Sequence, residues 1–476
     1  MINPILEFLE ETYGFAPPAH IYAPITEARA WWSGMWGPFH LSLERHAGHA
    51  PYRREMYKMG MAKKICEDWA TVLCNDRTAV TTGDAAMDAV LLGDRRGYGG
   101  YLTHGNFRGR LHAFVEQVFA LGMGAAVIHP TGAVYADDGR LIGADGMETD
   151  FLPADQVFPM QVSDGGVTSC AFLGQRCGGT DEDCAYIVSV HLAKDDGWRI
   201  ENHAFDADLN PTALPEGMRQ RFVSGTKLFA ILTPNTQPTD ALAASFGMGA
   251  PVFACAYDNL KGVDLAYNNF CRDLYLGGKK VFMNRELIGE DAMGNRVAPD
   301  DVAQQLFMTV GDGDLSADTM IVEHNPALRA DENCRALQAQ LDYLSFKVGF
   351  GTRHYRFADD RVVTATQYAG ERQEMFRNAS RHYLHMEAFW RELIGIAWYL
   401  AYPLGAAVYG GGVPDAPRNI TVDFDDSFFI DPAAERERDL AEVRAGIMAP
   451  WEYRVRHYGD SEEHARTVVS ALTASM

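Results

Sequence analysis

The stretch AYDNLKGVDLAYNNFCRDLYLGGKKVFM, residues 256–283, predicts the element that decides the fold. Apolar side chains recur in it at steps of three and four residues, which is the spacing of one face of a helix. The paired glycines Gly277 and Gly278 mark its end, because glycine is favoured just past a helix C-terminus. Such a helix is roughly 30 Å long. Its apolar face consists of Leu260, Val263, Tyr267, Phe270 and Leu274.

A second helix of similar length follows after residues 279–328, a mixed segment with the strand-like runs KVFMN and LFMTV and with turns rich in glycine and aspartate. Two matched helices therefore bracket a small inserted unit. Their apolar stripes also have a simpler explanation, because the two faces can pack on each other within any helical hairpin. The second helix ends near Gly349 and Gly351, and its apolar face carries Leu337, Leu341 and Leu344.

Beyond the second helix the sequence predicts a loop, a long helix and a helical C-terminal unit. The polar loop TRHYRFADDRVV covers residues 352–363. A helical pattern begins with a capping box at Thr364 and continues to Pro403, on the order of 55 Å if it is unbroken. One strand is expected at 419–424, and three further helices are expected within 429–476.

Upstream of residue 250 the pattern mixes helices with strands. Residues 54–76 and about 103–121 have helical spacing. From Gly124 to about residue 206, alternating runs such as AYIVSVHL are separated by clusters of glycine and aspartate, which predicts antiparallel strands with tight turns. The fold class predicted for the chain is α+β.

Composition and charge place the chain among globular proteins and limit its partners. Of 476 residues 47% are hydrophobic and 22% are charged. The formal net charge is −22, so the chain lacks the overall basic character that a tight grip on duplex DNA requires. Either the chain does not contact nucleic acid, or it contacts DNA through an interaction that must remain weak. No apolar run suits a membrane span, and the start MINPILEFLEETYGF predicts no secretory signal, so a cytoplasm-like compartment is expected.

Motifs of nucleotide, hydrolytic and zinc chemistry are missing from the sequence, so no enzymatic activity, cofactor or metal is expected. Residues 277–280 lack the upstream glycine and the hydroxyl residue of a phosphate-binding loop, and neither HExxH nor GxSxG occurs. Asp423, Asp425 and Asp426 lie along a predicted strand, where side chains alternate faces, so a solvated strand end is expected instead of a cation site. No CxxC pair occurs, and buried or half-buried free thiols are expected at Cys66, Cys74, Cys170, Cys177, Cys184, Cys255, Cys271 and Cys334.

Four segments, in this order and at these intervals, resemble the portal proteins of long-tailed bacteriophages, the family whose members carry a stem–clip–stem insertion. MYKMGMAKKICEDWATVLCND at 56–76 looks like the family's early helix, with its "AKK…EDWA" pattern. Residues 256–283 are similar to its first stem helix and the entry to its clip. TATQYAGERQEMFRNASRHY at 364–383 looks like the start of its long helix after the tunnel loop. Residues 425–459 are similar to its C-terminal helical region, and the resemblance covers about residues 50–475.

The resemblance implies a portal fold. This fold has a mixed α/β wing, a two-helix stem that brackets a small α/β clip, a long radial helix and a helical crown. The implied boundaries are 1–250 for the wing, 251–278 and 329–350 for the two stem helices, 279–328 for the clip, 351–428 for the tunnel loop, the long helix and the return strand of the wing, and 429–476 for the crown helices.

The resemblance also implies a function without catalysis. A portal is a homo-oligomeric ring, usually of twelve subunits, that sits at one vertex of the virion capsid among the major capsid protein. It is the channel for genome packaging and ejection, and double-stranded DNA passes through it without sequence specificity. Terminase docks on it during assembly in the host cytoplasm, and head-completion or tail-connector proteins bind later. No membrane takes part, and ring closure requires a head-to-tail interface with rotational symmetry.

In a portal, the loop from Thr352 to Val362 would face the channel. Its basic side chains would meet DNA phosphates, while its aspartates would limit the grip. Even a contact of about 1 kcal/mol would matter when repeated around a ring. Without a partner the same residues would form an ordinary exposed polar loop. The candidate channel residues are Arg353, His354, Arg356, Asp359, Asp360 and Arg361.

Two other classes of protein compete with the portal. One is a cytoplasmic enzyme of an unrecognised family, with a pocket built around the first 250 residues. The other is a different structural protein of the virion head or connector. The missing catalytic motifs count against the enzyme. The length of the chain and the order of its elements count against the second class, because adaptor proteins are usually much shorter.

Overall fold

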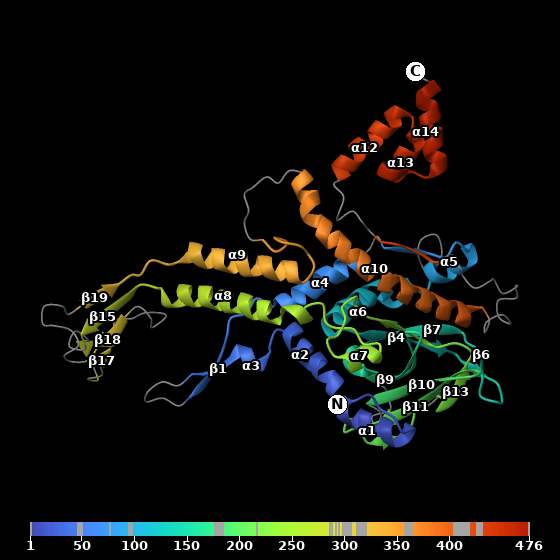
Figure 1. The fold of residues 1–476 in the computed structure, drawn as a ribbon, viewed down its shortest axis with the longest axis horizontal. Coiled ribbons are helices and arrows are strands. Elements are labelled where there is room, and N and C mark those ends of the chain that lie inside the picture. The colour runs from blue at the N-terminus through green and yellow to red at the C-terminus, as the bar shows by residue number, and fades with distance from the viewer. Residues whose placement is uncertain are drawn as a thin grey trace.

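The computed structural model has a body of helices and sheets, from which a long arm of two helices extends (Figure 1). Helices and strands are both abundant, so the predicted mixture of the two is confirmed. The structure describes residues 2–44, 51–75, 78–93, 99–175, 185–215, 218–284, 289–290, 293, 296–297, 307–310, 321–356, 365–402, 419–424 and 432–474.

Two antiparallel sheets form the centre of the body. In the first sheet β4 lies between β14 and β7, and in the second the strands β8 to β12 follow one another, with β13 also paired to β11. The strands predicted downstream of Gly124 are therefore present. The first sheet consists of β4 (Gly124–Thr131), β7 (Gly146–Pro153) and β14 (Phe229–Leu232); the second of β8 (Val157–Ser163), β9 (Gly166–Gln175), β10 (Tyr186–Lys194), β11 (Gly197–Phe205), β12 (Pro211–Thr212) and β13 (Arg221–Ser224).

Two helices pack on the first sheet, and a third helix packs on those two. The helix α6 (Phe107–Leu121) packs on β7 and β4, and α10 (Ala365–Ala401) packs on β14. The helix α4 (Met61–Leu73) packs in turn on α6 and α10. Ile65 and Trp69, four residues apart on α4, are fully buried, as expected for the apolar face of an amphipathic helix.

The N-terminal segment connects the second sheet to the base of the arm. The hydroxyl of Tyr22 donates a hydrogen bond of 3.1 Å to the carbonyl of Val157 at the start of β8. The remaining small elements are α1 (Ile2–Tyr13), η1 (Ala19–Tyr22), α2 (Ala23–Trp32), α3 (Gly37–His40), β1 (Leu41–Glu44), β2 (Tyr52–Glu55), β3 (Ala79–Thr81), α5 (Ala85–Leu92), η2 (His104–Asn106), β5 (Val134–Tyr135), β6 (Leu141–Gly143), η3 (Ala154–Gln156), α7 (Ala241–Ser245) and η4 (Ala254–Ala256).

The two helices predicted in the first 125 residues begin later than expected. Residues 54 and 55 belong to the strand β2, which pairs with β1, and the chain turns at Gly60 in a left-handed conformation before α4 begins. Tyr57 is therefore not part of the helix. The second helix, α6, starts at Phe107, because the preceding Asn106 is also left-handed, with φ of 53°.

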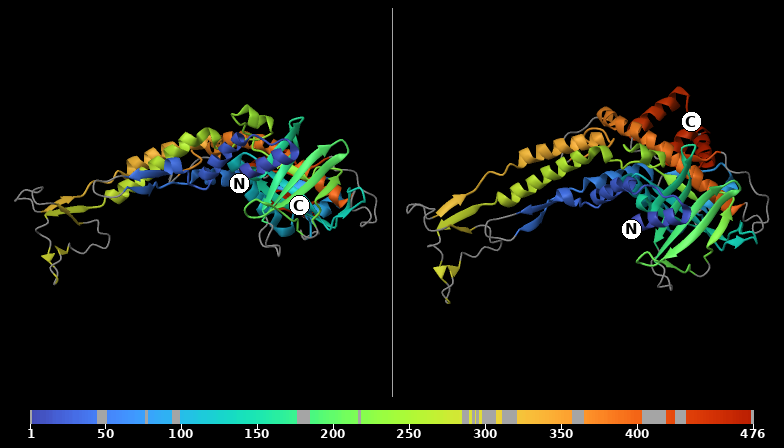
Figure 2. Two further views of the ribbon diagram at one scale, coloured as in Figure 1. Left: turned by 90° about the horizontal axis from the view of Figure 1, so that it is seen from below. Right: turned by 60° about the horizontal axis from the view of Figure 1, so that its bottom comes forward.

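The arm consists of two antiparallel helices with a small sheet at their far end. The helices α8 (Tyr257–Leu276) and α9 (Ala330–Lys347) lie side by side in every view (Figures 1 and 2). The strand β15 (Lys280–Asn284) pairs in parallel with β18 (Phe307–Val310) and antiparallel with β19 (Ile321–His324). The predicted order of helix, inserted strands and helix is thus observed. A two-stranded hairpin, β16 (Gly289–Glu290) with β17 (Arg296–Val297), completes the described part of the tip.

The C-terminal third contains the long helix and a separate group of short helices. The helix α10 runs without a break from Ala365 to Ala401, so the length predicted for it is confirmed. None of the helices in the described ranges is long and apolar enough to span a membrane. The strand β20 (Thr421–Asp423) pairs with β3, and the three predicted terminal helices are α12 (Pro432–Ala445), α13 (Pro450–Tyr458) and α14 (Glu462–Ala474).

The cysteines match the prediction only in part. Cys66, Cys74 and Cys170 are buried, and Cys271 is half-buried. Cys255 lies in η4, the turn that leads into α8, and Cys334 lies on the outer side of α9. Both are exposed, so the prediction is wrong for these two. Several predicted features lie outside the described residues, namely Thr364 of the capping box, Asp425, Asp426, Cys177 and Cys184.

Candidate functional site

Most of the residues from which the two arm helices were predicted are buried. Leu341 and Leu344 of α9 are fully buried, and Leu337 is nearly so. On α8, Leu260 and Val263 are buried as well, while Leu274, towards the tip, is 46% exposed. Packing is therefore tight near the body and looser towards the tip. The remaining predicted arm residues, Tyr267 and Phe270, are half-buried.

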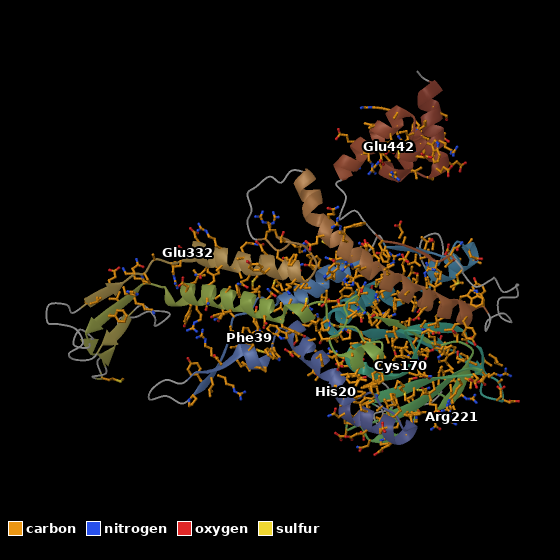
Figure 3. The ribbon with its side chains drawn as sticks, viewed as in Figure 1. His20, Phe39, Cys170, Arg221, Glu332 and Glu442 are labelled. Atoms are coloured by element: carbon orange, nitrogen blue, oxygen red, sulfur yellow. The ribbon has the colours of Figure 1, made fainter. Side chains whose placement is uncertain are left out.

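Large apolar side chains also occupy the outer surfaces of both arm helices. On α8, Leu265 is 49% exposed and Tyr275 is 59% exposed. On α9, Tyr343 is 64% exposed, and Phe346 is exposed as well. Exposed apolar surface of this kind is typical of a face that contacts another protein. The outer arm also carries charge, since Glu332 lies exposed near the start of α9 (Figure 3).

A buried polar contact fixes α8 to the N-terminal segment. The backbone N–H of Trp36 donates to Nδ1 of His40 (2.9 Å), so Nε2 of this ring carries the proton that is donated to Asp264 Oδ2 (3.0 Å). The other carboxylate oxygen of Asp264 accepts the backbone N–H of Met59 (2.8 Å). His40 and Asp264 are both buried, which makes their pairing necessary, because an unpaired charge in such a place is costly. This contact holds the inner end of the arm.

A second polar contact joins the two arm helices near the tip. Asp273 at the end of α8 accepts hydrogen bonds from the backbone N–H of Arg329 (3.3 Å), from Arg329 Nη2 (3.0 Å) and from Asn333 Nδ2 (3.0 Å). The hydrogen bond from the Arg329 side chain is the main reason why the pKa of Asp273 lies below its ordinary value. The arm is thus fastened at both ends, which suits an element that must keep its direction.

The segment that follows α9 is anchored on two other helices. The indole N–H of Trp69 on α4 donates to the carbonyl of Val348 (3.1 Å), and Nδ2 of Asn378 on α10 donates to the carbonyl of Gly349 (2.8 Å). Gly349 itself has a φ of 90°, which only glycine adopts without strain. The chain therefore leaves α9 in a fixed direction, at the junction of α4, α9 and α10.

A column of stacked rings continues this anchor. The ring of Phe350 stacks on Trp69, with centroids 4.5 Å apart, and on His354, with centroids 4.4 Å apart. Nε2 of His354 lies 3.9 Å from Asp68, which also pairs with Lys64. Burial alone would raise the pKa of Asp68, but hydrogen bonds from His354 and Lys64 outweigh it and lower this pKa. The root of the loop is therefore rigid and charged.

The predicted loop residues divide into two groups. Arg353 is exposed at the root, with a φ of 66°, and its carbonyl accepts a hydrogen bond of 2.7 Å from Nε of Arg356. His354 lies beside them in the stacked column. The structure thus brings three of the predicted residues together at one end of the arm. The others, Asp359, Asp360 and Arg361, lie outside the described residues.

The polar residues that hold the arm in place do not follow from apolar spacing. Asp264 and Asn268 follow Leu260 at steps of four, so they lie on the same buried face of α8. A carboxylate within an apolar stripe was the available signal, because it requires a buried partner. The partner, His40, is 224 residues away in the sequence and could not be identified from spacing. Within the part of the chain that is described, no three His, Cys, Asp or Glu side chains are grouped to hold a metal ion.

No protein-family model matches this sequence, and no curated protein matches it. Among solved structures, one match is described as the neck of a native GTA particle computed with C12 symmetry. The match has a TM-score of 0.33 and 14% sequence identity, and covers 84% of this chain and 89% of that chain. At this level of likeness the function has to be argued from the chain itself.

Proposed function

We propose that this chain is the portal subunit of a tailed bacteriophage. Copies of it would close into a ring at one capsid vertex and form the channel for packaging and ejection of the genome. The observation that carries the proposal is the arm: two antiparallel helices, fastened at both ends, with a strand-built tip at one end and an anchored, basic loop root at the other. The order of these elements is also the order in which the sequence resembles portal proteins.

In such a ring the arms would stand side by side around the axis and form the wall of a tube. The exposed apolar residues of α8 and α9 would then contact the neighbouring copies, in a head-to-tail interface that repeats until the ring closes. The tip would be the docking surface for terminase and later for connector proteins, and the body would face the major capsid protein. The loop root would present Arg353 to the bore, while the net charge of −22 would keep the contact with DNA loose.

Electron microscopy of the purified full chain tests the ring. We expect annular particles with an axial hole, and a particle mass that is a multiple of the 52.7 kDa subunit. A protein that stays monomeric or dimeric under every assembly condition would contradict the proposal.

The loop root is tested by replacing Arg353 and Arg356 together with alanine. We expect rings to form as before, while the yield or the length of packaged DNA changes, because two basic groups per subunit are lost from the bore. Arg140→Ala is the matched control, since Arg140 is an exposed arginine of the body that pairs with Asp138. If the double variant packages DNA as the control does, these arginines do not contact DNA.

A further inference from the structure

A cavity between the two sheets of the body has no role in the proposed ring. It has a volume of about 580 Å³ and is lined by β4 and β7 on one side and by β9, β10 and β11 on the other. Cavities of about 300–1,000 Å³ are typical of sites that bind small molecules. In Figure 3, Cys170 on β9 and Arg221 on β13 mark the second sheet, which forms one wall.

The inner wall of the cavity is apolar and partly aromatic. Phe172 and Phe222 of the second sheet line it, together with Leu152 of the first sheet and Ile200. The ring of Phe222 also packs against Tyr135, with centroids 5.3 Å apart. Flat aromatic walls favour a flat apolar ligand, since rings attract one another in stacked or edge-to-face arrangements.

One buried polar group points to the ligand's chemistry. His191 lines the cavity although only 2% of it is exposed, and its ring lies edge-on to Phe172. Its Nε2 is 3.1 Å from the hydroxyl of Ser189, but its Nδ1 has no hydrogen-bond partner among the described residues. Burial lowers the pKa of His191 to about 3, so the ring is neutral at neutral pH. Because the Ser189 hydroxyl can donate or accept, Nδ1 is free to accept from a ligand or to donate to it.

The other end of the lining is acidic and open to solvent. Glu148 and Asp150 are two residues apart on β7, so their side chains lie on the same face of that strand. Nε2 of His129 on β4 lies 3.2 Å from Asp150, and this hydrogen bond lowers the pKa of the carboxyl group. Arg219, the one arginine among the described residues of the lining, stacks over Tyr135. Two carboxylates near the mouth favour a ligand with a positively charged end.

We propose that this cavity binds a small aromatic amine. Its ring would lie against Phe172 and Phe222, a hydroxyl or N–H group on the ring would hydrogen-bond to Nδ1 of His191, and its ammonium group would lie at Glu148 and Asp150. The site belongs to a single subunit and does not depend on ring formation. A failure of the binding proposal would therefore leave the proposed function untouched, and the reverse also holds.

Three related probes test this chemistry by isothermal titration calorimetry on the full chain. Tyramine carries both a phenolic hydroxyl and an ammonium group, phenethylamine lacks the hydroxyl, and 3-(4-hydroxyphenyl)propionate carries a carboxylate in place of the ammonium. We expect saturable binding of tyramine and affinities about tenfold weaker for the other two, since each loses one of the polar contacts. Equal affinities would show that the proposed polar contacts do not select the ligand, and no saturable heat with millimolar tyramine would show that the cavity does not bind such an amine; either result would overturn the proposal.

Two variants locate the binding. Gly174 lies on the same face of β9 as Phe172. Among the described residues, a Cβ added there would meet the carbonyl oxygen of Ile187 alone, at 3.7 Å, so Gly174→Leu should fold and fill the cavity. We expect it to abolish tyramine binding. Gly166→Leu, at the exposed start of the same strand, is the control and should bind as the natural chain does. His191→Phe keeps a ring at this position but removes Nδ1. We expect this variant to bind tyramine and phenethylamine with equal affinity. An unchanged affinity for tyramine in Gly174→Leu or in His191→Phe would contradict the assignment.

Discussion

At the scale of single residues, the attachment of the arm depends on the carboxylate of Asp264. We expect Asp264→Ala to lower the free energy of unfolding by about 3 kcal/mol, because Nε2 of the buried His40 and the backbone N–H of Met59 both lose their hydrogen-bond acceptor. Urea denaturation followed by circular dichroism measures the change.

The matched control is Asp258→Ala on the same helix. The side chain of Asp258 is 95% exposed and pairs with the neighbouring Lys261, so its loss should change stability by about 0.5 kcal/mol or less. Equal effects of the two substitutions would show that the buried contact has no special weight.

Asp439 makes the C-terminal helices sensitive to acid. Its Oδ2 accepts hydrogen bonds of 2.9 Å from Arg456 and from His457. The contact with Arg456 is the main cause that lowers the pKa of Asp439 from 3.8 to about 2. A carboxyl group whose pKa is lower in the folded chain stabilises the fold above its ordinary pKa, and this contribution is lost as the pH falls towards the folded value.

We therefore expect the helices α12 to α14 to lose protection from hydrogen exchange between about pH 4 and pH 2. Asp439→Asn should be less stable at neutral pH and should lack this part of the pH dependence. Glu437→Gln, an exposed carboxyl two residues earlier, should behave like the natural chain. A natural chain and an Asp439→Asn variant with parallel pH profiles would refute the assignment.

At the scale of elements, the inner and outer faces of α9 have different expected roles. Leu341 is fully buried, so Leu341→Ala should lower the free energy of unfolding of the single chain by about 2–5 kcal/mol. Tyr343, two residues later, is 64% exposed. Tyr343→Ala should leave the stability of the single chain within about 1 kcal/mol of the natural value and should weaken ring formation instead.

Denaturation and sedimentation velocity together separate these effects. If Tyr343→Ala forms rings at the same protein concentration as the natural chain, the outer face of α9 is not part of the subunit interface. If Leu341→Ala is as stable as the natural chain, the two helices do not support each other.

The helices could be predicted because the apolar residues of one helix face lie close together in the sequence. The faces of α8 and α9 and the uninterrupted course of α10 follow from steps of three and four residues, which the sequence displays directly. The start of α4 was missed because residues 54 and 55 pair with β1, and such pairing depends on a distant segment. The cavity residues were missed for the same reason: His191 and Asp150 come from different sheets, and alternation within a strand does not say which strands face each other.

At the scale of the whole molecule, the charge limits how strongly the chain can hold DNA. With a formal net charge of −22, the chain should bind a short DNA duplex no more tightly than non-specific binders do, with a Kd weaker than about 10⁻⁴ M near physiological salt. Fluorescence anisotropy with a labelled duplex measures this. Micromolar binding would contradict a sliding contact and would indicate a basic surface that the overall charge conceals.

The α+β class could be predicted from the sequence, because helical and alternating patterns occupy separate stretches of it. The length of the arm followed from two matched helices. The direction in which the arm leaves the body could not be predicted, since it depends on buried polar contacts such as that of His40 with Asp264. The proposed ring would be a property of several copies, and the structure of one chain indicates it only through the apolar residues that the chain leaves exposed.

The strand pairing at the tip has a consequence for the way this chain can vary. Lys280, just after the first arm helix, is paired directly with His324, just before the second, so the chain enters and leaves the tip at the same place. A segment with adjacent ends can be shortened, lengthened or exchanged while the elements that flank it keep their register. The tip can therefore be exchanged as a unit. If it is the docking surface proposed above, grafting a foreign tip between these two strands would transfer the binding preference of that tip while α8 and α9 stay unchanged.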